Sequence, residues 1–158
     1  MISNKNILNT QELVSIGGNA YRPKIEGAFT KFVFQNNYWE LTDKTGIKYR
    51  LGFNADSKIS SPTVGLNQTP GTYKWSIDKV TDLFGNYIEF TYTSHENQLY
   101  PNTIIYTKND ADRRLLTNQV SFTLEDRPDS NINYRSGIKI TTSKRISNVN
   151  VTSANPAG

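Results

Sequence analysis

The sequence predicts an all-β protein made of antiparallel hairpins that follow one another as a meander. Three observations support this class. Polar and apolar residues alternate in run after run, the runs are rich in Tyr, Phe, Val and Ile, and Gly, Asn, Asp or Pro separates them. An apolar stripe with helical spacing persists nowhere for about twelve residues, so a helical core is excluded.

The first predicted strands form a three-strand meander. Residues 29–35 alternate, and Asn36-Asn37 then supplies a tight turn because Asn tolerates left-handed backbone angles. Residues 38–42 alternate again. The turn at 43–46 combines Asp at its first position with Gly at its last, and a third strand follows over 47–51.

Later strands are predicted by the same signals and bring the total to about nine. They are expected at residues 73–80, 87–93, 100–106, 120–124, 138–142 and 146–151. A charged, Pro-containing turn is predicted over 126–135, where Asp126, Arg127, Asp129 and Arg135 would form a salt-bridged clasp. Acid–base catalysis by Glu125, Asp126 and Asp129 is the less favoured interpretation, because cations are mixed among them.

Two of the turns share one sequence plan. Leu41-x-Asp43-x-x-Gly46 and Val80-x-Asp82-x-x-Gly85 each place an apolar residue before Asp and a returning strand after Gly. Because both copies carry the Asp, it is predicted to shape the turn rather than to catalyse a reaction. The predicted structural turn residues are Asp43, Gly46, Asp82, Gly85 and Asn86. Repeated hairpins of this kind usually stack on their neighbours.

The second repeat lies within a longer run that points to a family. The run YKWSIDKVTDLFGNYIEFTYT at 73–93, followed by LYPNTIIYT at 99–107, resembles the B-component and virulence-plasmid B-protein family of bacterial toxin complexes, whose members continue into Rhs/YD-repeat shells. WELTDKTGIKYRLG at 39–52 and the segment 120–145 are similar to the flanking hairpins of the same family. The resemblance extends in ordered blocks over roughly residues 21–151.

The resemblance implies a structural role. The chain is expected to be a piece of a longer secreted protein and to form part of a spiral or solenoid-like β-sheet shell that encloses a toxin polypeptide. The expected organisation is an N-terminal arm or edge strand at 1–28, a β-hairpin wall module at 29–151 with a long loop at 54–71, and a flexible tail at 152–158. Expected partners are neighbouring domains of the parent chain, the enclosed toxin and, through sheet edges, further copies.

Catalytic, cofactor and metal sites are not predicted. The chain has no cysteine and one histidine, so a metal site would lack its usual ligands. It also lacks a nucleophile elbow and a phosphate-binding loop. The formal net charge of +4 is spread among acidic residues, which does not favour nucleic acid. Neither a signal peptide nor an apolar run long enough to span a membrane is present in this sequence.

A binding module is the alternative prediction. Exposed Tyr and Trp side chains could hold glycans at a cell surface, with Trp39 and Trp75 as the platform. Packing of aromatic side chains across neighbouring strands is the commoner use of such residues, because they occupy alternating strand positions.

Overall fold

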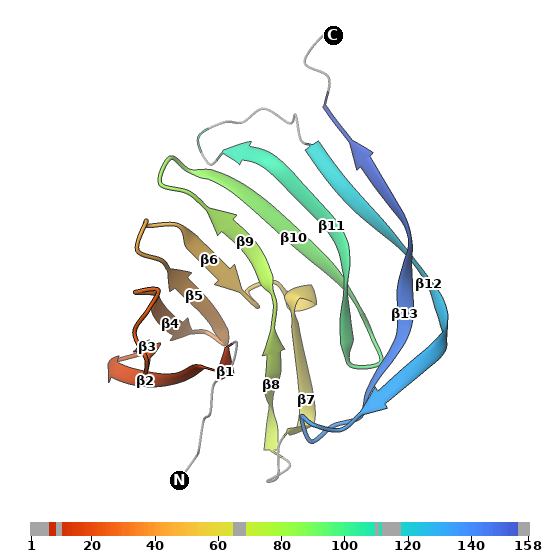
Figure 1. Ribbon diagram of the computed structural model, residues 1–158, viewed down its shortest axis with the longest axis horizontal. Coiled ribbons are helices and arrows are strands. Elements are labelled where there is room, and N and C mark those ends of the chain that lie inside the picture. Colours follow the sequence, from red (N-terminus) through yellow and green to blue (C-terminus); the bar gives the residue numbers. More distant parts are fainter. Residues whose placement is uncertain (1–6, 9–10, 65–68, 110, 112–117, 155–158) are drawn as a thin grey trace.

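The chain folds into one large antiparallel β-sheet and one separate hairpin (Figure 1). This computed structural model describes residues 7–8, 11–64, 69–109, 111 and 118–154. Among them the large sheet has eleven strands, and β7 pairs only with β8. Strands that are neighbours in the sequence are neighbours in the sheet, except that β6 pairs with β9 and so skips the hairpin. The predicted all-β, antiparallel class is confirmed.

The strands vary in length from the N-terminus to the C-terminus of the described chain. Their bounds are β1 Ile7–Leu8, β2 Gln11–Gly17, β3 Ala20–Pro23, β4 Lys31–Gln35, β5 Tyr38–Thr42, β6 Lys48–Leu51, β7 Lys58–Val64, β8 Thr69–Trp75, β9 Ile77–Thr81, β10 Asn86–His95, β11 Gln98–Asn109, β12 Asn118–Asn133 and β13 Ile140–Thr152. A short 3-10 turn, η1, covers Ala55–Ser57. The long strands β12 and β13 lie at the opposite side of the sheet from β2 and β3 (Figure 1).

The meander predicted from residue 29 onward is present as β4, β5 and β6. Asn36 and Asn37 take left-handed φ angles of 48° and 61°, which is the conformation that a tight hairpin needs. Ahead of this meander, where the sequence predicted an arm or a short edge strand, β2 and β3 form a further hairpin that pairs with β4.

The predicted long loop at 54–71 is wrong over 58–64 and 69–71, which form strands, while residues 65–68 lie outside the described residues. Residues 58–64 form β7, which pairs with β8 from Lys58 opposite Trp75. Pro62 suggested a loop, yet it lies where the register of the ladder shifts between Ser61 and Val64, a place that tolerates a missing N–H. The strand expected over 73–80 is also two strands, because β8 ends at Trp75 and β9 begins at Ile77 in the other sheet.

The predicted charged turn at 126–135 lies mostly within β12, which continues to Asn133. Its register against β13 shifts between Asp126 and Asn131, so the Pro-containing part is an irregular stretch of strand. The reversal itself comes later, where Gly137 N–H donates to the Tyr134 carbonyl at 2.9 Å. The two strands expected over 138–151 are one, β13. Residues 155–158 of the predicted tail lie outside the described residues.

The hydrophobic core lies on one face of the N-terminal half of the sheet. Phe32, Trp39, Leu41 and Leu51 are all buried and come from the adjacent strands β4, β5 and β6. Trp75 of β8 covers them, with its ring centroid 6.4 Å from that of Trp39 in an edge-to-face arrangement. The separate hairpin therefore serves as the lid of this core.

Candidate functional site

The two Asp-x-x-Gly turns have one hydrogen-bond pattern. In the first turn Asp43 Oδ1 accepts from the Thr45 and Ile47 N–H groups at 2.8 and 3.1 Å. In the second, Asp82 Oδ1 accepts from the equivalent Phe84 and Asn86 N–H groups at 2.8 and 2.9 Å. These hydrogen bonds stabilise the charged form of each carboxylate and so lower its pKa. The largest cause is the side-chain bond from Thr45 for Asp43 and the side-chain bond from Asn86 for Asp82.

The glycines of these turns have the backbone conformation that the repeat predicted. Gly46 has a φ of 86° and Gly85 a φ of 79°, both in the left-handed region. The turns are also neighbours, because β6 pairs with β9. Leu83 of the second turn lies against Gly46 of the first, where an added Cβ would come within 2.6 Å of Leu83 Cδ2. The two repeats therefore stack on each other.

Asp78 is a buried anchor that the sequence interpretation missed. Its side chain is fully buried, and Arg50 Nε donates to Oδ1 at 2.5 Å. Oδ2 accepts from the Phe53 N–H at 2.6 Å, the Asn54 N–H at 3.1 Å and the Ser57 hydroxyl at 2.9 Å. A carboxylate can be buried at acceptable cost only with such partners. Asp78 thus fixes the corner at which the chain leaves the sheet toward β7.

Strand β8 ties together the ends of two hairpins. Trp75 Nε1 donates to the Asn37 carbonyl at 3.1 Å, and the Tyr73 hydroxyl donates to the Asn97 carbonyl at 2.5 Å. Lys74 Nζ donates to Gln98 Oε1 at 3.0 Å. Burial lowers the pKa of Lys74 and raises that of Tyr73, since it disfavours the charged form of each.

The structure brings together part of the predicted clasp. Arg127 donates two bonds to Asp129, at 2.9 and 2.8 Å. Asp126 instead pairs across the ladder with Lys144, whose Nζ lies 2.5 Å from Oδ1. Arg135 lies in the turn beyond β12, where its N–H donates to Asn133 Oδ1 at 3.3 Å. These carboxylates are exposed, and their pKa values are lowered by the paired cations.

Burial counts against the predicted aromatic platform. Trp39 is only 7% exposed and lies beneath Trp75, so it has no free ring face for a sugar. Trp75 is partly buried against the same core. The expectation that Trp39 is exposed is wrong, because Trp75 of the separate hairpin packs over it.

The described residues contain no group of three or more His, Cys, Asp or Glu side chains that could hold a metal ion. His95, the one histidine of the chain, lies beside Glu96, with 3.8 Å between Nε2 and the carboxylate. The part of the chain that the structure describes also has no helix long and apolar enough to cross a bilayer.

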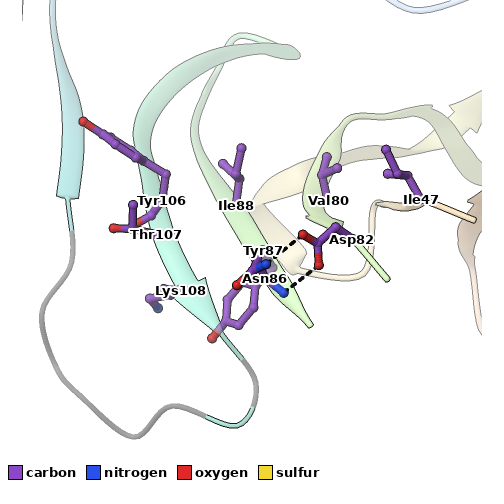
Figure 2. A pocket seen from close by; sticks show the side chains of 9 residues that line it. All are labelled: Ile47, Val80, Asp82, Asn86, Tyr87, Ile88, Tyr106, Thr107 and Lys108. Atoms are coloured by element: carbon purple, nitrogen blue, oxygen red, sulfur yellow. Dashed lines mark hydrogen bonds between the residues drawn. The ribbon is translucent and has the colours of Figure 1, made fainter. Parts of the chain in front are cut away.

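A shallow cavity of about 350 Å³ adjoins the second turn. Figure 2 shows Ile47, Val80 and Ile88 projecting on the same side of the sheet, whereas the ring of Tyr106 on β11 is directed away from them. Asp82 and Asn86 of the turn line its edge. Its wall is largely apolar, with Asp82 and Lys108 as the charged residues among its lining.

The apolar face continues beyond the core, where it is partly buried on the inner strands and exposed on β13. Directly opposed residues form a row across four strands: Phe90, Ile104, Val120 and Val151. Phe122 opposes Val149 in the next row. Val149 and Val151 are 51% and 61% exposed. We call the apolar residues of β12 and β13 on this face, namely Val120, Phe122, Leu124, Ile146, Val149 and Val151, the bare face.

The other side of β12 and β13 is polar. Asn148 opposes Thr123 and Asn150 opposes Ser121, each between the apolar pairs. The alternation is that of a sheet with one wet side and one side meant for burial. Sequence alternation predicted both faces, but only the structure shows which half of the apolar face remains open.

Comparisons with known proteins agree with this architecture. Residues 5–136 match the family model SpvB, described as Salmonella virulence plasmid 65kDa B protein. No curated protein matches the chain in sequence.

Two solved structures have the same fold. The N-terminal domain of effector protein SpvB from Salmonella typhimurium strain LT2 superposes with a TM-score of 0.71 at 17% identity, over 87% of this chain and 58% of that one. The crystal structure of TcdB2-TccC3-TEV gives 0.66 at 15% identity, over 85% of this chain and 9% of that one. This chain thus spans little more than half of the first structure. The resemblance predicted from the sequence is confirmed: the chain belongs to the Salmonella virulence plasmid 65kDa B protein family.

Proposed function

We propose that this chain is a non-catalytic wall segment of a larger secreted toxin protein, and that its bare face lies against an enclosed, non-native toxin polypeptide. The bare face is the observation that carries this proposal. An apolar sheet face of this extent is normally covered in a monomeric domain. A polypeptide that exposes its own apolar side chains is a partner that fits it.

The strand order supports the wall role. β13 is the last strand of the sheet, and its outer edge has no partner among the described strands. Residues 146–152 of this edge contain neither charge nor Pro, the usual means of blocking an edge. We propose that the sheet continues from this edge in the parent protein, as one turn of a spiral or solenoid-like shell. The matched fraction of the two solved structures is consistent with a parent of greater length.

The edge also predicts how the isolated chain behaves. Its free N–H and C=O groups are a template for another strand, so the chain should self-associate through β13. Analytical ultracentrifugation over a range of concentrations measures this. A chain that stays monomeric throughout, with one cooperative and high thermal transition, would contradict the proposed continuation of the sheet.

The bare face is tested with a matched pair of variants on one strand. Val149→Lys with Val151→Lys places two charges on the bare face, and Asn148→Lys with Asn150→Lys places the same charges on the polar face. The probe is a fluorescent, permanently unfolded polypeptide such as reduced and carboxymethylated α-lactalbumin, followed by anisotropy. We expect the bare-face variant to lose at least about tenfold in affinity, because burying unpaired charge is costly.

The polar-face variant should bind the probe as the unchanged chain does. Both variants alter the same edge strand by the same charge, so a difference between them reports the face and not the edge. Equal binding by the two variants, or no binding of the probe by the unchanged chain, would overturn the proposal.

A further inference from the structure

Strand β11 contains a strained bulge where it pairs with β10. The register of the ladder shifts there, so that Tyr106 and Thr107 stand against Ile88 alone. Thr107 has a φ of 63°, in the left-handed region that a β-branched residue rarely adopts. Strain of this kind persists only where the surrounding structure enforces it, and it is common where proteins hold ligands.

The bulge explains why the sheet has a cavity at this place. In a regular ladder one residue of β11 would oppose Ile88 and pack beside it. Here the ring of Tyr106 is directed away from the apolar side chains of the cavity (Figure 2). Ile47, Val80 and Ile88 are therefore left open along a volume of about 350 Å³, and Ile88 is 37% exposed.

The two charged residues of the cavity lining are already paired. Asp82 accepts hydrogen bonds from the Phe84 N–H and from both the N–H and the side-chain amide of Asn86. Lys108 Nζ lies 2.8 Å from the Glu89 carboxylate. A charged ligand would therefore lose its hydration without gaining a free counter-charge, whereas an uncharged apolar group gains by leaving water. The lining thus favours an uncharged, apolar ligand.

The cavity is continuous with the bare face. Ile88 and Phe90 are two residues apart on β10, so their side chains lie on the same face of the sheet. Phe90 opposes Ile104 of β11, and Ile104 opposes Val120 of the bare face. A polypeptide on the bare face would therefore reach the cavity across β11 without leaving the apolar side of the sheet.

We propose that this cavity is an anchoring subsite for one aromatic side chain of the polypeptide that lies on the bare face. The inference rests on the proposed function and adds a chemical preference to it. The volume accommodates one aromatic ring, and burying such a ring removes a large apolar area from water. The strain at Thr107 is retained because the bulge that it forms keeps the subsite open.

The small probe N-acetyltryptophanamide tests the subsite without a polypeptide. We expect its titration into the full chain to shift the methyl NMR signals of Ile47 and Ile88, and to leave that of Ile25, which is 77% exposed, unchanged. Ile88→Trp fills the cavity with a ring of the chain itself, so the shift at Ile47 should then require at least about tenfold more probe. Ile16→Trp is the matched control, because Ile16 is 48% exposed on β2, outside the cavity; it should leave the titration unchanged.

A deletion tests the role of the bulge. Without Thr107 a single residue opposes Ile88, so Tyr106 should return to the ladder, close the cavity and weaken binding of the small probe as Ile88→Trp does. If the small probe shifted neither Ile47 nor Ile88, or bound Ile88→Trp and Ile16→Trp equally, the subsite would be overturned while the bare face stood.

The unfolded α-lactalbumin probe tests whether the polypeptide uses the subsite. Ile88→Trp should weaken its binding at least about threefold, whereas Val149→Lys with Val151→Lys should leave binding of N-acetyltryptophanamide unchanged. Undiminished binding of the polypeptide by Ile88→Trp would overturn the inference and leave the proposed function intact. Binding of the small probe alone, with no binding of the polypeptide by the unchanged chain, would overturn the proposed function and with it this assignment of the occupant.

Discussion

Trp39 and Val149 lie on the same apolar face of one sheet, but in different surroundings. Trp39 is 7% exposed beneath Trp75 of the separate hairpin, whereas Val149 is 51% exposed with nothing described above it. The strands around both residues alternate in the same way. The alternation of polar and apolar residues therefore produces an apolar face on the sheet. Whether that face is buried depends on an element that packs over it.

The covering element enters the fold at one place. The hairpin of β7 and β8 is inserted between β6 and β9, which pair with each other across the gap in sequence. Asp78 and Arg50 hold the corner where it leaves. β12 and β13 have no such insertion between them, and Val149 and Val151 remain exposed. The covered half therefore contains a packed cluster of buried apolar residues, whereas the bare face contains none that is fully buried.

Removing a large side chain from each half should give the largest contrast. Trp39→Ala empties a packed site and should lower the free energy of unfolding by about 3–5 kcal/mol. Val149→Ala removes a half-exposed side chain and should cost no more than about 0.5 kcal/mol. Urea denaturation followed by tryptophan fluorescence or circular dichroism measures both. Similar losses at the two sites would show that the bare face is covered in solution.

Breaking the corner should have the next largest effect. Asp78→Asn leaves Arg50 without its carboxylate partner and should destabilise the chain by about 3 kcal/mol, since the site is buried. Asp126→Asn, which removes an exposed partner of Lys144, is the matched control and should not shift the urea midpoint measurably. If the two variants behaved alike, the corner would not be what holds the hairpin over the core.

The sequence predicted local features well and long-range covering poorly. Asp43 and Asp82 act within their own turns, so their spacing to Gly46 and Gly85 was enough to predict the geometry. Asp78 is different, because its partners at 50, 53, 54 and 57 lie far from it in sequence and no local pattern links them.

The burial of Trp39 was missed for the same reason. It depends on β8, which pairs with β7 through a stretch that Ser60, Ser61 and Pro62 made resemble a loop. Polar and Pro residues are poor strand formers on average, yet pairing with a partner strand overrides that preference. Propensity could therefore predict the strands of the sheet, but not which half of its face would be covered.

Glycine substitutions should separate the stacked turns from the rest of the covered half. Gly46→Ala forces a Cβ into left-handed backbone and toward Leu83, and should cost about 1–2 kcal/mol. Gly27→Ala is the control, because an added Cβ there meets nothing within 4 Å; it should be neutral within about 0.5 kcal/mol. Thermal unfolding measures both. Equal effects would mean that the first turn adjusts freely.

The smallest expected effect is on the stability of the chain at acidic pH. It should be the same for the turn of Asp43 and the turn of Asp82. Hydrogen bonds lower the pKa of Asp43 and Asp82 below the ordinary value of 3.8. The unfolded chain then binds protons more readily, so stability present above that value is lost as the pH falls through the lowered pKa values. Asp43→Asn and Asp82→Asn keep an accepting oxygen but cannot titrate, so each should flatten the fall of the urea midpoint below about pH 4 by a similar amount. If only one of the two variants flattened the fall of the urea midpoint, the shared hydrogen-bond geometry of the turns would not be what sets the acid sensitivity.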